Sequence, residues 1–203
     1  MPSPLILLTM ALGYLLGSIP FGLLIARIGG AGDLRQIGSG NIGATNVLRT
    51  GRKGLAAATL LLDMGKGAVA VLIGAHLMAG GGIIAGVMAF IGHCYPVWLR
   101  FAGGKGVATM MGVVVALHWP SGLVFAVVWL GALFASRRSS VGGMGAAISA
   151  PVAAAAFHRL DLLQPFLLLA VVVLWRHRAN IRRLLDGTEP KVGKKAAGGD
   201  GAG

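Results

Sequence analysis

The stretch His118-Trp119-Pro120-Ser121-Gly122 decides how many times this chain is predicted to cross a membrane. It interrupts Val107–Ala135, an apolar run that is too long for one relaxed transmembrane helix. Proline and glycine in such a stretch favour a turn. We therefore divide Val107–Ala135 into two spans joined by a turn at residues 118–122.

The remaining apolar residues form five further runs. With the two halves of Val107–Ala135 they make seven predicted spans, the other five being Pro4–Ile28, Gly54–Met78, Gly82–Leu99, Val141–Phe157 and Leu162–Trp175. Apolar residues make up 56% of the 203 residues and charged residues only 12%, a balance that excludes an ordinary soluble domain. The 34 glycines indicate close packing between helices. The predicted fold class is an all-α integral membrane protein with about seven transmembrane helices.

The positions of Lys and Arg test this number and predict the orientation. With seven spans, all of the 18 Lys and Arg residues except Arg159 and Lys66 fall on one side of the membrane. With six spans, Arg137, Arg138 and the basic C-terminal segment would change sides. Because positive loops face the cytosol, we expect the N-terminus outside, the C-terminus in the cytosol and the glycine-rich loops on the cytosolic face.

The chain is expected to form one domain. Residues 1–191 are predicted to be a single polytopic membrane domain, with Pro4–Ile28 retained rather than cleaved as a signal peptide, and residues 192–203 a disordered Gly/Lys/Ala tail. The net charge of +12 would suggest nucleic acid in a soluble protein. Here the basic residues lie between apolar runs and aromatic residues are few, so we predict no nucleic-acid partner.

The first polar motif is Gly38-Ser39-Gly40-Asn41-Ile42-Gly43-Ala44-Thr45-Asn46-Val47-Leu48-Arg49. Its glycines allow a backbone to approach an anion closely, and Arg49 can add a bidentate contact. It contains the pattern G-x-G-x-x-G, but a transmembrane helix precedes it instead of the strand that a dinucleotide site requires. We favour phosphate binding over both a dinucleotide site and a plain flexible loop.

Three further polar segments are predicted on the same side. Gly103-Gly104-Lys105-Gly106 precedes a span and can hold an anion through the ammonium and the helix N-terminus, although a lysine that only sets topology is as probable without context. Ser139-Ser140 begins another span. In the last segment His177 and Asn180 recur at helical spacing, with Glu189 beyond them, and a surface amphipathic helix is the simpler interpretation when this segment is taken alone.

Two oppositely charged residues lie inside the second predicted span. Asp63 and Lys66 lie three residues apart, and we interpret them as a structural ion pair rather than a proton relay. The histidines lack the spacing of metal ligands, and no carboxylate cluster suited to Mg²⁺ is present, so neither a metal nor a cofactor is predicted.

Taken together, the polar segments resemble the bacterial acyl-phosphate:glycerol-3-phosphate acyltransferases, the PlsY family. The similarity rests on Gly38–Arg49, on Gly103–Thr109 and on His177–Asn180 followed by Gly187–Lys191, and it extends over the chain to Lys191. It implies an enzyme of the bacterial inner membrane with its active site facing the cytosol. The implied reaction transfers an acyl chain from acyl phosphate to the sn-1 hydroxyl of glycerol 3-phosphate and yields lysophosphatidic acid and phosphate, the first step of phospholipid synthesis.

The resemblance also suggests roles for individual residues. The expected catalytic residues are Ser39, Arg49, Lys105, His177 and Asn180. The expected substrate-binding residues are Gly38, Gly40, Asn41, Thr45, Asn46, Gly103, Gly104, Gly106, Ser140 and Glu189. The proton of the attacking hydroxyl can pass to His177 or to a phosphate oxygen of a substrate, with the second route favoured.

The expected partners are glycerol 3-phosphate, acyl phosphate and membrane lipids, with an enzyme that supplies acyl phosphate as a further candidate. Two other functions use the same residues differently. A transporter for an organic phosphate would need polar residues through to both membrane faces. A membrane scaffold would leave Asn41, Lys105 and Asn180 without a purpose.

Overall fold

The computed structural model describes residues 2–37 and 39–192. The regular secondary structure of these described residues is entirely helical, and they contain no strand. The α-helices, in chain order, are α1 Pro4–Gly17, α2 Phe21–Ile28, α3 Ala44–Arg49, α4 Lys53–Leu77, α5 Gly81–Cys94, α6 Val107–Leu117, α7 Trp119–Ser136, α8 Ser139–Ala156, α9 Leu160–Arg176 and α10 Arg178–Leu185; two 3-10 turns, η1 Leu34–Gln36 and η2 Val97–Leu99, complete it.

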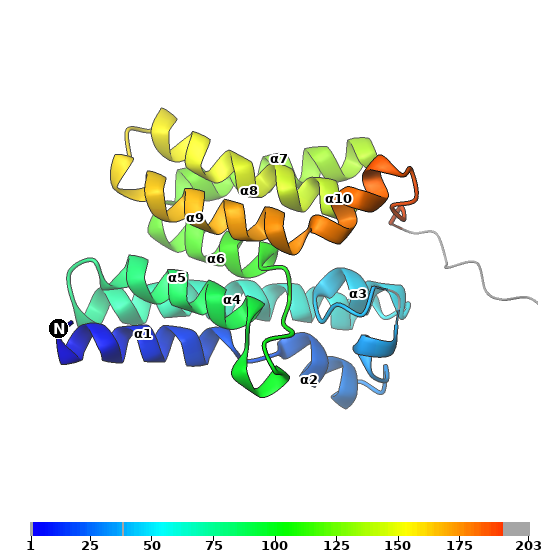
Figure 1. Ribbon diagram of the computed structural model, residues 1–203, viewed down its shortest axis with the longest axis horizontal. Coiled ribbons are helices and arrows are strands. Elements are labelled where there is room, and N and C mark those ends of the chain that lie inside the picture. The colour runs from blue at the N-terminus through cyan, green and yellow to red at the C-terminus, as the bar shows by residue number, and fades with distance from the viewer. Residues whose placement is uncertain (1, 38, 193–203) are drawn as a thin grey trace, which may run out of the picture.

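The long helices form two layers (Figure 1). One layer holds α1, α4 and α5, and the other holds α7, α8 and α9, with α6 lying between them and packing on both α4 and α7. Phe90, Met110, Phe125 and Phe166 come from both layers and are fully buried in a common core. The short helices α2, α3 and α10 gather at one end of the molecule (Figure 1).

Each of the seven predicted spans is helical, but they differ in length. Five helical segments among the described residues are long and apolar enough to cross a membrane, and a sixth results if α9 and α10, which are bent by 58°, are counted together. The one predicted span that is not long enough is α6, which has only 11 residues. At about 1.5 Å per residue it falls well short of the ~30 Å hydrocarbon core. The predicted membrane-protein class is confirmed, whereas α6 alone is too short for a full span.

The turn predicted at residues 118–122 is present but narrower than expected. Only His118 separates α6 from α7, and Trp119–Gly122 already belong to α7. Pro120 lies in the first helical turn, where its missing N–H costs no hydrogen bond and its fixed φ suits the helix. The proline therefore begins the next helix directly.

The first predicted span is broken in the structure. α1 ends at Gly17 and α2 begins at Phe21, so Ser18 and Ile19 have carbonyl groups outside a regular helix. Trp98 Nε1 donates to the Ser18 carbonyl at 2.8 Å, and Lys66 Nζ donates to the Ile19 carbonyl at 2.7 Å. Such partners are required for irregular backbone at membrane depth.

Two glycine contacts show how closely the helices pack. A Cβ at Gly17 would collide with the backbone of Ala89, where α1 meets α5. A Cβ at Gly112 would collide with the carbonyl of Met64, where α4 meets α6. Small residues at such crossings let membrane helices approach through their backbones.

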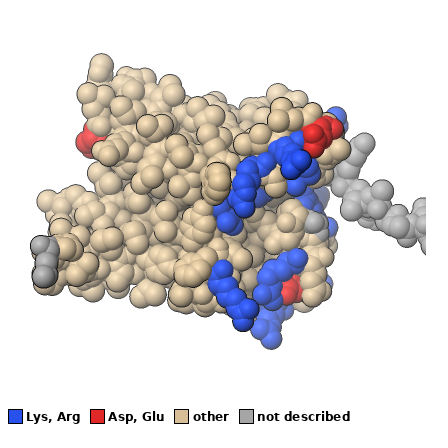
Figure 2. All heavy atoms as spheres, in the orientation of Figure 1, with Lys and Arg blue, Asp and Glu red and all other residues tan. Residues whose placement is uncertain are grey.

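The basic residues gather at one end of the molecule. In Figure 2 the Lys and Arg side chains lie over the end that carries α2, α3 and α10. Of the predicted tail, Val192 is bonded through its N–H to the Arg137 carbonyl at 2.7 Å, and residues 193–203 lie outside the described residues.

Candidate active site

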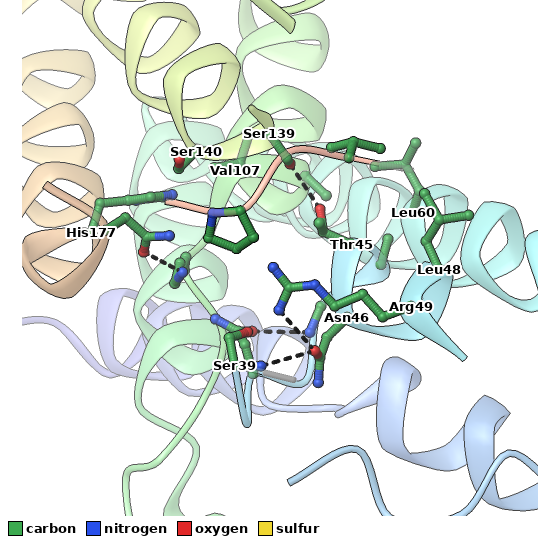
Figure 3. A pocket seen from close by; sticks show the side chains of 18 of the residues that line it. Ser39, Thr45, Asn46, Leu48, Arg49, Leu60, Val107, Ser139, Ser140 and His177 are labelled. Carbon is green, nitrogen blue, oxygen red and sulfur yellow. Dashed lines mark hydrogen bonds between the residues drawn. The ribbon is translucent and has the colours of Figure 1, made fainter. Parts of the chain in front are cut away.

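The candidate active site is a cavity of about 1300 Å³ lined by residues from the basic end of the molecule. Its wall combines side chains from α3, from the start of α6 and α8 and from the α9–α10 junction (Figure 3). Segments far apart in the sequence therefore meet around one space.

Most of the predicted site residues line this cavity. They are Ser39, Asn41, Thr45, Asn46, Arg49, Lys105, Gly106, Ser140, His177, Asn180 and Glu189. Gly40, Gly103 and Gly104 do not line it, and Gly38 lies outside the described residues.

The first motif is organised by the side chain of Asn46, which is buried. Its Nδ2 donates to the carbonyls of Leu34 and Ile37 at 2.8 and 2.9 Å. Its Oδ1 accepts from the Ser39 N–H at 3.3 Å and from Arg49 Nη1 at 3.4 Å. Asn46 thus shapes the loop and directs Arg49 toward the centre of the cavity (Figure 3).

A contact between two hydroxyl groups connects this motif to the opposite layer. Thr45 Oγ1 and Ser139 Oγ lie 2.8 Å apart (Figure 3). Thr45 is in the first turn of α3 and Ser139 begins α8. The contact therefore joins α3, which packs on α4, to α8 of the other layer at the wall of the cavity.

Gly103 and Gly104 pack against the end of α5. Their N–H groups donate to the carbonyls of Cys94 and His93 at 3.2 and 3.0 Å. A Cβ at Gly104 would collide with the His93 imidazole. These two glycines were expected to bind substrate, but their N–H groups are already bonded to the end of α5, and their proximity to α5 explains the need for glycine.

Lys105, the next residue, begins a network of polar side chains. Its Nζ donates to Asn180 Oδ1, and Asn180 Nδ2 donates to Glu189 Oε1 at 2.7 Å. Glu189 also accepts from Ser140 Oγ at 2.6 Å and from Arg183 Nε at 2.8 Å. Each member is held by the next, so the network presents Lys105 and Asn180 in one defined arrangement.

The environment changes the pKa of both charged members. Burial is the main cause that lowers the pKa of Lys105 to about 8, and it outweighs the opposing charge of Glu189. Burial raises the pKa of Glu189, but the hydrogen bonds from Ser140, Asn180 and Arg183 outweigh burial and keep this pKa below its ordinary value. At neutral pH the lysine is mostly an ammonium and the glutamate a carboxylate.

His177 is held as a neutral imidazole. Burial is the main cause that lowers its pKa to about 4. Its Nδ1 lies 2.8 Å from the Val173 carbonyl, which can only accept a hydrogen bond. Nδ1 therefore carries the proton of the neutral ring, and Nε2 is left as an acceptor.

Helices α6 and α8 both begin at the cavity. Val107 and Ala108, at the start of α6, and Ser139 and Ser140, at the start of α8, line its wall. The free N–H groups of a helix N-terminus attract anions. Together with Arg49 and Lys105 they make this end of the cavity suited to phosphate groups.

Comparison with known proteins identifies the family. A family model described as glycerol-3-phosphate acyltransferase matches residues 7–187. The chain belongs to the glycerol-3-phosphate acyltransferase family. A protein of this name from Mesorhizobium japonicum is 54% identical over 190 residues, covering 94% of this chain and 97% of the relative. One from Zymomonas mobilis is 54% identical over 201 residues, covering 92% of this chain and 95% of the relative.

Two solved structures of PlsY, an integral membrane glycerol 3-phosphate acyltransferase, have the same fold. The glycerol 3-phosphate form has a TM-score of 0.87 and 38% identity, covering 93% of this chain and 96% of that one. The lysophosphatidic acid form has a TM-score of 0.83 and 35% identity, covering 92% and 94%. These similarities confirm both the family predicted by resemblance and the integral membrane class.

The cavity of this glycerol-3-phosphate acyltransferase also has an apolar part. Leu48, Leu60, Met111, Phe125 and Trp129 line it, and they come from α3, α4, α6 and α7. A polar region that attracts anions therefore adjoins an apolar region within one cavity. This combination suits an amphiphile with a phosphate at one end.

Some lining residues were not among the predicted site residues. Lys53 and Arg183 add positive charge, and Asp63 and His93 contribute from α4 and α5. Asp63 forms the predicted ion pair, with Lys66 Nζ 2.7 Å from Asp63 Oδ1, and His93 Nδ1 lies 3.5 Å from the same oxygen. Within residues 2–37 and 39–192 no group of three or more His, Cys, Asp or Glu side chains is arranged to hold a metal ion.

Proposed function

We propose that this glycerol-3-phosphate acyltransferase takes its acyl group from acyl phosphate and transfers it to the sn-1 hydroxyl of glycerol 3-phosphate. The products are lysophosphatidic acid and inorganic phosphate. The observation that carries the proposal is the union, in one cavity, of a cationic region and an apolar region. Both substrates are phosphates, and only the acyl donor needs an apolar wall.

The proposed binding mode follows the polarity of the cavity. The phosphate groups contact Arg49, Lys105 and Ser39, together with the N-termini of α6 and α8. The acyl chain lies along the apolar wall formed by Leu60, Met111 and Trp129. This arrangement brings the acyl carbon close to the polar region, where the glycerol hydroxyl is held.

The proposed reaction is a direct acyl transfer. The sn-1 oxygen attacks the carbonyl carbon of acyl phosphate, a new C–O ester bond forms, and the bond from that carbon to the phosphate oxygen breaks. Because acyl phosphate is an activated anhydride, positioning and charge stabilisation provide most of the catalysis. The departing phosphate carries away the electron pair, and Arg49 and Lys105 stabilise its charge.

The hydroxyl proton passes to a phosphate oxygen rather than to His177. A phosphate monoester has a second pKa of about 6, whereas burial lowers the pKa of His177 to about 4. His177 is thus the weaker base near neutral pH. We assign His177 and Asn180 the role of orienting the glycerol, with the Nε2 of His177 accepting from a hydroxyl group.

Glu189 and Asn46 are assigned supporting roles. Glu189 accepts from Ser140, Asn180 and Arg183, which leaves its carboxylate committed to organising the site. Asn46 uses its amide to hold the first motif in shape. Neither role requires direct contact with the reacting atoms.

The proposed location is the bacterial inner membrane, with the cavity facing the cytosol. The gathering of Lys and Arg at the cavity end supports this orientation. Asp186 and His158 are exposed at opposite ends of α9–α10. In a Cys94→Ala background, an impermeant maleimide added to spheroplasts should label His158→Cys and should label Asp186→Cys only after lysis. The reverse pattern would overturn the orientation.

The donor is tested with purified protein in detergent, using palmitoyl phosphate and palmitoyl-CoA in separate assays with glycerol 3-phosphate. We expect lysophosphatidic acid from palmitoyl phosphate only. Formation from palmitoyl-CoA alone would overturn the proposed donor. No product with either, from folded protein, would favour a phosphate transporter instead.

A further inference from the structure

Arg176 holds the backbone that carries Lys105. Its Nε donates to the Gly104 carbonyl at 3.0 Å, and its Nη2 donates to the Gly103 carbonyl at 2.7 Å. The guanidinium also lies 5.1 Å from the centre of the Tyr95 ring. The planar guanidinium of Arg176 thus donates to two consecutive carbonyl groups and stacks on the face of the Tyr95 ring.

These contacts complete the hydrogen bonding of the two glycines. Their N–H groups already donate to the carbonyls of Cys94 and His93, at the end of α5. All four backbone polar groups of Gly103 and Gly104 are therefore occupied, two by α5 and two by Arg176. Glycines lack a Cβ and restrict the backbone least, so a loop of this composition needs such contacts to stay in one conformation.

The position of Arg176 connects the loop to the rest of the site. It is the last residue of α9, directly before His177, and α10 follows with Asn180. Two hydrogen-bonded contacts therefore connect Lys105 to the α9–α10 junction. Arg176 binds the backbone just before Lys105, and Asn180 accepts a hydrogen bond from its ammonium. A change in the clamp would move Lys105 relative to His177 and Asn180.

We infer that Arg176 is a positioning residue for acyl transfer, which acts by clamping the Gly103–Gly104 backbone so that Lys105 faces the substrate phosphate. The inference rests on the proposed function. It requires the geometry of the guanidinium, because a lysine carries the same charge but cannot offer the planar fork of donors that spans both carbonyls.

Arg176→Lys is therefore the decisive variant, and Arg178→Lys is its matched control. Arg178 is exposed, lies over Trp175 and donates only to the Trp175 carbonyl at 3.3 Å. We expect Arg176→Lys to lower kcat/KM for glycerol 3-phosphate on the order of ten- to a hundredfold, since misplacement by about 1 Å can cost that much. Arg178→Lys should stay within about twofold. Equal, near-normal activity of both variants would overturn the inference, whereas an inactive wild type would instead contradict the proposed function.

A second measurement separates positioning from general structural damage. Binding of glycerol 3-phosphate is measured by calorimetry for the wild type, Arg176→Lys, Lys105→Ala and the double variant, so that no turnover is needed. If Arg176 acts through Lys105, its replacement weakens binding several-fold only when Lys105 is present. Losses that multiply in the double variant would show that Arg176 acts independently of Lys105 and would contradict the inference.

Discussion

The ammonium of Lys105 donates a hydrogen bond to Oδ1 of Asn180, 75 residues further along the chain. This contact joins the loop before α6 to the helix after α9 at the wall of the cavity. Since Asn180 is held in turn by its hydrogen bond to Glu189, the position of the ammonium depends on α10 and on the segment that follows it.

Removal of the Lys105 ammonium should abolish most activity without unfolding the protein. We expect Lys105→Ala to reduce kcat/KM by about 10²–10³, the range typical for loss of one stabilising donor at a transition state. Thermal unfolding in detergent serves as the control and should change little. Activity within about threefold of the wild type would contradict the role assigned to Lys105.

The activity should decrease in mildly alkaline solution. Burial lowers the pKa of Lys105 to about 8, so the ammonium loses its proton as the pH rises through this value. The pH profile of kcat/KM reports the free enzyme and should show a falling limb near pH 8. Lys105→Arg, which stays charged, should lack this limb. A wild-type kcat/KM that stays constant up to pH 10 would contradict this prediction.

On the acidic side of the same profile, the fall in kcat/KM should be set by the pKa of the substrate phosphate and not by the pKa of His177. With the pKa of His177 lowered to about 4, protonation of the substrate phosphate near pH 6 is the first event on acidification. A thiophosphate analogue of glycerol 3-phosphate, which is more acidic, should therefore move the limb to lower pH. If His177→Asn moved the limb and the analogue did not, the imidazole would be the base.

Glu189 should contribute to stability as well as to activity. Its side chain is 4% exposed and accepts from three donors. Glu189→Gln removes the charge that pairs with Arg183 and replaces one accepting oxygen with an NH₂ group that can only donate. We expect a loss of about 1–3 kcal/mol in the free energy of unfolding. The matched control is Asp161→Asn, which breaks the exposed pair with Arg159 and should have almost no effect. Equal thermal shifts for both variants would refute this account.

Gly104 should be required for packing. A Cβ there would collide with the His93 imidazole, whereas a Cβ at Gly131 in α7 meets nothing within 4 Å. We predict that Gly104→Ala lowers both the unfolding temperature and kcat, and that Gly131→Ala leaves both near the wild-type values. An unchanged unfolding temperature for Gly104→Ala would contradict the packing role assigned to this glycine.

The broad architecture could be predicted from sequence because hydropathy and the positions of Lys and Arg reflect the membrane itself. Each of the seven apolar runs is helical, although the first is divided into α1 and α2. The division of Val107–Ala135 near residue 118 is present, but the turn predicted over residues 118–122 is limited to His118, and Pro120 lies in the first turn of α7. Two features of the helices were not predicted. The break at Ser18–Pro20 is marked in the sequence by Pro20, which interrupts a helix, but the hydrogen bonds from Lys66 and Trp98 that satisfy its carbonyl groups come from distant segments and depend on packing. The length of α6 depends on where the glycine-rich loop before it ends and the helix begins.

The sequence also indicated most of the residues that line the cavity. Polar side chains between apolar runs indicated Arg49, Lys105 and Asn180, and all three line the cavity. Sequence could not tell that the N–H groups of Gly103 and Gly104 bond to the end of α5, since that contact depends on packing. Lys53 was missed because a lysine at the start of a span looks like any residue that sets topology.

The most direct test of the central claim follows the oxygen atom that attacks. Glycerol 3-phosphate labelled with ¹⁸O at the C1 hydroxyl is incubated with palmitoyl phosphate and the purified protein, and the products are analysed by mass spectrometry. Direct acyl transfer predicts lysophosphatidic acid that retains the label and an equal amount of unlabelled inorganic phosphate. Glycerol bisphosphate with free palmitate, or palmitate and phosphate without lysophosphatidic acid, would contradict the account.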